Sequence, residues 1–147
     1  MPCLDVARSH DAKQKLCDDL EALADALPDR IDRRKCLIVA ASLPALLEHS
    51  HAYEEKHVFP AFQRNDQNRL TRAMTVRRLK IEHMEDEASA HDLADVLGEI
   101  GAGGPVKNPE ALGFMLRAFF EAMRRHIAFE REHIFPVTAT RPDEPSH

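Results

Sequence analysis

His126-Ile-Ala-Phe-Glu130-Arg-Glu-His133-Ile-Phe-Pro136 is the stretch that decides the fold of this chain. A near copy stands upstream, His51-Ala-Tyr-Glu54-Glu55-Lys-His57-Val-Phe-Pro60. Both stretches contain a histidine, a glutamate, a second histidine, an apolar residue, Phe and Pro in the same order. Residues four apart lie on the same face of an α-helix, so His126 and Glu130 are predicted to sit one above the other. We therefore interpret the chain as a doubled unit.

Each copy is preceded by one further histidine at nearly the same distance, His10 before the first and His83 before the second. Four histidines and two carboxylates are thereby distributed over four segments of the chain. A single structural zinc would take four ligands, often with Cys among them. The set of donors is instead typical of a site for two metal ions of borderline softness.

Composition limits the classes of partner. At 147 residues, with 44% hydrophobic residues, the chain is long enough for one domain with a real core. A net charge of -5 and the lack of a long Lys or Arg run argue against a nucleic-acid partner. We expect no signal peptide and no membrane span, because the start lacks a basic-then-apolar pattern and Pro44 interrupts the longest apolar run. Three cysteines without C-x-x-C spacing fit reduced thiols and a cytoplasmic protein.

Four segments carry apolar residues at helical spacing, and none alternates as a strand would. Asn108 is a good N-cap and Pro109 suits a first helical position, while Pro60 and Pro136 are expected to end helices and Pro44 to bend one. The predicted helices run from Asp5 to Leu27, from about Ile31 to Phe59, from about Leu70 to Ile100, and from Asn108 toward Pro136. Residues 137–147 are predicted to form a flexible tail.

Four amphipathic helices with short connections favour an all-α, antiparallel up-down-up-down four-helix bundle over residues 1–136. In that topology the starts of the first and third helices share one end of the bundle with the ends of the second and fourth. His10, His51 and His126 then lie at the same height. His83 joins them if its helix begins between residues 71 and 75.

This arrangement resembles the hemerythrin-like, or HHE cation-binding, family. The family signature is a histidine on the first helix, H-x-x-x-E on the second, a histidine on the third and H-x-x-x-E on the fourth. The resemblance covers about residues 5–136, and residues 126–136 match it without a gap. It implies a non-haem di-iron centre. The implied terminal ligands are His10, His51, His83 and His126, and the implied bridges are Glu130 and a glutamate of the second helix.

The second helix departs from the family pattern, because one residue is missing between His51 and Pro60. The distance to the proline is matched by Glu54, whereas the distance from the histidine is matched by Glu55. At about 100° per residue, Glu54 lies about 20° from the apolar stripe at Leu43 and Glu55 about 120°. We therefore prefer Glu54 as the bridge, with Glu55 taking that place if the helix is rotated.

Three alternatives remain open at this point. Residues 54–57 and 130–133 are also E-x-x-H pairs, the motif of ferritin-like di-iron proteins, but that site needs a glutamate from each of the other two helices and the first offers only Glu21. The bundle could also be metal-free, with solvated histidines. Glu87, which stands where the family commonly has a fifth histidine, is a candidate extra ligand.

The resemblance implies a protein that holds two irons per chain, with other divalent metals binding in vitro. Its expected partner is a small ligand, namely O2, a peroxide or nitric oxide, which it binds or senses. The alternative is a di-iron enzyme, such as an oxidase, a peroxide scavenger or an iron donor for the repair of iron-sulfur clusters.

Overall fold

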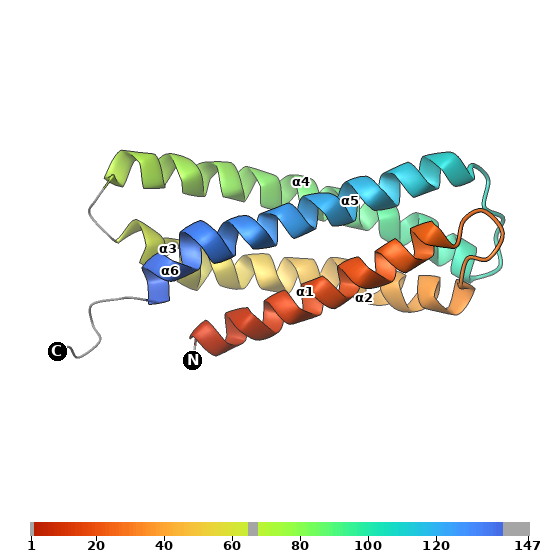
Figure 1. Ribbon diagram of the computed structural model, residues 1–147, viewed down its shortest axis with the longest axis horizontal. Coiled ribbons are helices and arrows are strands. Elements are labelled where there is room, and N and C mark those ends of the chain that lie inside the picture. Colours follow the sequence, from red (N-terminus) through yellow and green to blue (C-terminus); the bar gives the residue numbers. More distant parts are fainter. Residues whose placement is uncertain (1, 65–67, 140–147) are drawn as a thin grey trace.

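The computed structural model describes residues 2–64 and 68–139, and within these ranges it is helical with no strand. The long helices alternate in direction, and the start of the first described helix and the end of the last lie at the same end of the bundle (Figure 1). This confirms the predicted all-α four-helix bundle. The elements are α1 Pro2–Asp25, α2 Arg33–Tyr53, η1 Glu54–Val58, α3 Phe59–Gln63, α4 Arg69–Gly101, α5 Pro109–Phe129, η2 Glu130–Ile134 and α6 Phe135–Ala139.

Side-chain caps fix the starts of two helices. The Asp32 carboxylate accepts a hydrogen bond from the backbone N–H of Lys35 at 3.0 Å and begins α2. The Asn108 side chain accepts from the N–H of Ala111 at 3.0 Å, with Pro109 in the first turn of α5. Such caps satisfy backbone donors that have no partner within the helix. The predicted start of the last helix at Asn108 is thus confirmed.

The prediction that Pro60 and Pro136 end their helices is wrong. A wide π-helical turn, η1 or η2, ends two residues before each proline, and the chain continues as the short helices α3 and α6. A proline is tolerated in a first turn, where its missing N–H has no partner to lose. Residues 137–139 of the predicted tail are helical, and the rest of it lies outside the described residues.

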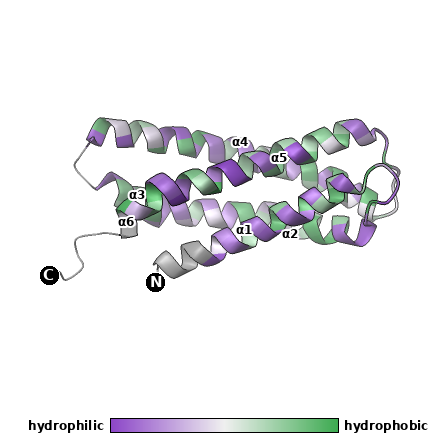
Figure 2. Ribbon diagram, in the orientation of Figure 1, coloured by the Kyte–Doolittle hydropathy of each residue, from purple (hydrophilic) through white to green (hydrophobic). Residues whose placement is uncertain are grey.

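The core consists of two apolar clusters with a polar layer between them. The chain passes from the larger cluster through buried polar residues into the smaller one along α2, η1 and α3 and along α5 and η2, and in the reverse order along α4. Hydrophobic and hydrophilic residues alternate along every helix, as expected for helices with one buried face (Figure 2). The smaller cluster contains Val58, Phe59, Phe62, Val76, Leu79 and Ile134.

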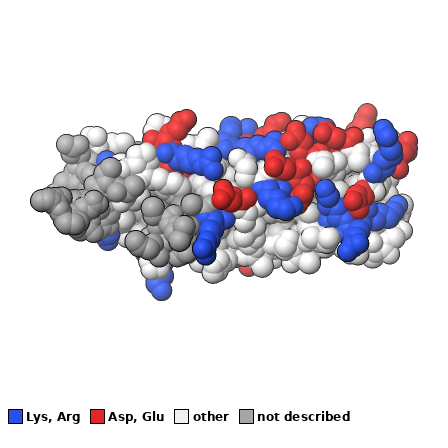
Figure 3. Space-filling view, turned by 60° about the horizontal axis from the view of Figure 1, so that its bottom comes forward, with Lys and Arg blue, Asp and Glu red and all other residues white. Residues whose placement is uncertain are grey.

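The surface is mixed in charge. On the face shown in Figure 3, basic and acidic side chains are interspersed, without a continuous basic area. None of the described helices is long and apolar enough to cross a membrane.

The two clusters allow a direct test of the packing. Leu97 lies in the larger cluster at 0% exposure, whereas Phe114 on α5 is 78% exposed. Leu97→Ala should lower the free energy of unfolding by about 2–5 kcal/mol because it leaves a cavity. Phe114→Ala should change it by less than about 0.5 kcal/mol. Urea denaturation followed by circular dichroism measures both, and equal losses would contradict the packing described.

Candidate metal centre

The polar layer contains side chains from each of the long helices α1, α2, α4 and α5 and from the π-helical turns η1 and η2. Its members share one property, which is that each side chain is at most 8% exposed. They are His10 and Lys13 of α1, Ser50 and His51 of α2, Glu54 of η1, His83 of α4, His126 of α5 and Glu130 of η2.

Glu130 joins two helices through its carboxylate. Its Oε1 lies 3.0 Å from Nε2 of His10, and its Oε2 lies 2.8 Å from Nε2 of His126. Burial alone would raise the pKa of Glu130, but the hydrogen bonds from the two rings outweigh it and hold that pKa well below 4.5. Burial likewise opposes protonation of His126, yet the adjacent Glu130 carboxylate raises the pKa of that ring. The layer therefore keeps a buried negative charge at Glu130.

Glu54 is held by different partners. Its Oε2 accepts a hydrogen bond from Nζ of Lys13 at 3.1 Å and a longer one from the Ser50 hydroxyl at 3.4 Å. Sequence reasoning missed both Lys13 and Ser50. The sequence did indicate a buried position for Lys13, because it stands three residues after His10 and at helical spacing from the buried Leu16 and Leu20.

His83 faces two carboxylates. Its Nδ1 lies 2.8 Å from Oε2 of Glu55, which assigns the ring proton to Nδ1. Its Nε2 lies 3.1 Å from Oε1 of Glu54 without forming a hydrogen bond, and neither buried atom has a hydrogen-bond partner among the residues that the structure describes. Two acceptors thus face each other at close range. Two donors bound at about 2.1 Å to one ion, at right angles, are about 3 Å apart, so this pair fits a metal ion.

His51 packs flat on His83, with ring centroids 3.7 Å apart and an angle of 3° between the planes. Its Nδ1 lies 2.7 Å from Oε2 of Glu87. Burial, followed by the positive charges that His83 and Lys13 can carry, lowers the pKa of His51 to about 2. The ring is therefore neutral at physiological pH, as a metal ligand must be.

The predicted site residues fall into an inner and an outer group. One donor atom from each of Glu54, His83, His126 and Glu130 lies within 4.8 Å of the others. His10 and His51 are buried beside them and contact members of this group. Glu55 and Glu87 are further out, with side chains 37% and 31% exposed, and each bonds the Nδ1 of a histidine ring. The choice of Glu54 as the bridge stays a prediction.

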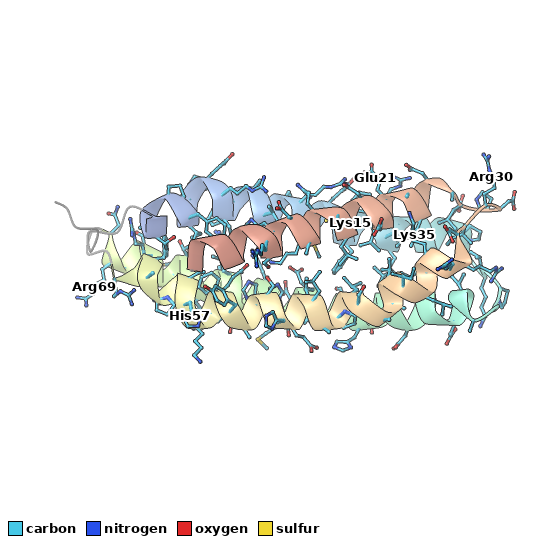
Figure 4. The ribbon with its side chains drawn as sticks, turned by 90° about the horizontal axis from the view of Figure 1, so that it is seen from below. Lys15, Glu21, Arg30, Lys35, His57 and Arg69 are labelled. Carbon is cyan, nitrogen blue, oxygen red and sulfur yellow. The ribbon has the colours of Figure 1, made fainter. Side chains whose placement is uncertain are left out.

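The ferritin-like alternative finds little geometric support. Both second histidines of the E-x-x-H pairs, His57 and His133, are exposed, and Figure 4 labels His57 near the α3 end of the bundle. Glu21, the only candidate glutamate of α1, pairs with Arg124 at 2.9 Å. The extra carboxylates that such a site requires are therefore not in the polar layer.

A cleft of about 380 Å³ connects the layer to the surface between α4 and α5. Its exposed lining includes Arg78, Glu85 and Arg125, and its inner wall includes the buried His126. Glu82, also in the lining, has Oε1 3.5 Å from Nδ1 of His126. A small molecule therefore has a route to one edge of the centre.

This geometry agrees with a comparison to known families. The model of the hemerythrin HHE cation-binding domain matches residues 5–138. The chain belongs to this family. No curated protein and no solved structure matches the chain. The resemblance drawn from the histidine and glutamate pattern is confirmed, and an HHE domain indicates metal-cation binding, with which the buried His and Glu cluster is compatible.

The lowered pKa of His51 predicts how the metal-free HHE domain responds to acid. A histidine kept neutral in the fold stabilises it fully above its unfolded pKa of 6.5, and that contribution is lost as the pH falls below 6.5. His126 acts in the opposite sense, because its raised pKa gives stability that is complete below 6.5 and lost as the pH rises above it. Between pH 6.5 and 5 the free energy of unfolding should therefore fall by about 2 kcal/mol through His51.

Urea denaturation in the presence of a chelator measures this change. His51→Gln, which cannot be protonated, should remove most of the dependence on pH in that range. An unchanged slope in His51→Gln would show that another group is responsible.

Proposed function

We propose that this HHE-domain protein is a non-haem iron protein, with two irons per chain, that binds or senses O2, a peroxide or nitric oxide. One observation carries the proposal. Oε1 of Glu54 and Nε2 of His83 are buried 3.1 Å apart without a hydrogen bond, beside the donor atoms of His126 and Glu130. Burying two such acceptors face to face is unfavourable unless a cation lies near both.

Each predicted ligand has a geometry that suits its role. Glu54 and Glu130 would bridge the ions, since each carboxylate spans two helices. The terminal ligands would be His10, His51, His83 and His126. A set of imidazoles and carboxylates suits iron, although zinc or cobalt can use the same donors.

The outer carboxylates would orient the rings. Glu55 accepts from Nδ1 of His83, and Glu87 accepts from Nδ1 of His51. Partners of this kind fix the ring tautomer and direct the opposite nitrogen inward, and their loss commonly weakens metal affinity. Glu87 therefore supports a histidine in this proposal and is not itself a ligand.

Bound iron would supply a redox couple and a coordination position for a small ligand. The chain supplies the surroundings. Phe59 stacks near His83 at 5.4 Å between ring centroids, and Ile134 is fully buried, so water is excluded from that side. The cleft between α4 and α5 provides access at His126.

The ligand assignment predicts which variants lose metal. The purified protein is loaded anaerobically with Fe2+ and then desalted. It should carry about two ions per chain by elemental analysis. His126→Ala should lose most of both ions. Glu54→Gln should lose at least one, because it removes a negative charge from a buried site.

Glu55→Gln is the matched control for Glu54→Gln. Its amide oxygen can still accept the hydrogen bond from His83, so this variant should keep both ions at saturating metal. Metal lost in Glu55→Gln and kept in Glu54→Gln would reverse the assignment of the bridge. Full metal content in His126→Ala would overturn the assignment of the metal site to these residues.

Exposure of the loaded protein to O2 separates the candidate functions. A binding or sensing protein should give an absorption change that reverses when O2 is removed. An oxidase or peroxide scavenger should instead consume an added reductant over many turnovers. Stopped-flow absorption and an oxygen electrode measure the two outcomes, and steady consumption of reductant would favour the enzyme.

A further inference from the structure

Lys13 is a buried cation inside the candidate metal centre. Its side chain is 1% exposed, and its ammonium group bonds Oε2 of Glu54, itself 2% exposed. Lysine is almost never fully buried unless it is paired. The pairing places a fixed positive charge on a carboxylate that the proposed function assigns to the metal ions.

A second contact fixes the same oxygen. The Ser9 hydroxyl donates to the Ser50 hydroxyl at 2.8 Å, and Ser50 donates to Oε2 of Glu54 at 3.4 Å. Oε2 is therefore held by two donors, the Lys13 ammonium group of α1 and the Ser50 hydroxyl of α2, while Oε1 faces His83 with no hydrogen bond. The two oxygens of one carboxylate are thus chemically unlike.

Glu130 shows the contrast. Both of its oxygens contact ring nitrogens, from His10 and His126. A neutral imidazole can move its ring proton to the other nitrogen and bind a metal ion through the lone pair that is freed, whereas an ammonium group has no lone pair. Glu130 can therefore bind metal through both oxygens while its two present partners become metal ligands. Glu54 can do so only on the side of Oε1.

We propose that Lys13 is a built-in cation at the second metal position, so that the two ions load in unequal steps. This inference rests on the proposed function and deepens it. A bridging carboxylate offers one oxygen to each ion. The first ion uses Oε1 of Glu54 together with His83. Lys13 would have to leave Oε2 before that oxygen could hold the second ion, and its positive charge nearby would weaken the binding of that ion.

The inference is tested by removing the positive charge of Lys13 and measuring how tightly each of the two ions binds. The full-length metal-free chain is titrated with Co2+ by calorimetry at pH 7.5, and the two dissociation constants are compared. Lys13→Gln removes the charge but keeps a donor for Glu54, and Lys13→Arg keeps the charge. Lys15→Met is the matched control, because Lys15 lies on the same helix, is 77% exposed and pairs with Asp19 away from the layer (Figure 4).

In the wild type the second ion should bind at least about tenfold more weakly than the first, and Lys13→Gln should strengthen the second step by about tenfold to a hundredfold. Lys13→Arg and Lys15→Met should keep the wild-type ratio. Two equal steps in the wild type, or an unchanged ratio in Lys13→Gln, would overturn this inference alone. Binding of no ion by the wild type would overturn the proposed function and this inference with it.

Discussion

Two carboxylates buried in the middle of a helical bundle are the constraint on which this structure depends. Glu54 and Glu130 are at most 2% exposed, and a buried charge is tolerated only with close partners. Their hydrogen-bond partners come from α1, α2 and α5, so satisfying the two charges ties three helices to η1 and η2. The polar layer is thus a structural element as well as a candidate site, and it interrupts an otherwise apolar core.

The π-helical turns explain which residues are buried between each glutamate and the proline that follows it. Each turn begins at the glutamate and is closed by a bond from the phenylalanine N–H back to that glutamate's carbonyl, from Phe59 to Glu54 and from Phe135 to Glu130. A wider turn changes the direction of the residues that follow it. Val58 and Ile134 are thereby buried in the smaller cluster, while His57 and His133 are exposed. π-turns of this kind are frequent at functional sites.

Much of the fold and most of the polar layer were predictable from the sequence, and the failures have physical causes. Helical periodicity and the Asn108 cap predicted the bundle, and the common height of His10, His51 and His126 predicted the level of the site. The π-turns escaped because proline usually ends a helix, and nothing in hydrophobic periodicity marks an i→i+5 bond. Lys13 escaped because lysine is expected at the surface, although its position on an apolar stripe was visible.

The doubled sequence suggests a symmetric centre, but one missing residue makes it asymmetric. His126 and Glu130 are four apart, so their side chains meet, and Nε2 of His126 lies 2.8 Å from Glu130. His51 and Glu54 are three apart, and His51 instead stacks on His83 and bonds Glu87. Position 50, four residues before Glu54, is occupied by Ser50, whose hydroxyl bonds Oε2 of Glu54 at 3.4 Å beside the ammonium group of Lys13. Strict repetition of the second copy would have placed a histidine at position 50, so the shortened spacing leaves a serine hydroxyl and a lysine ammonium group as the donors to Oε2 of Glu54.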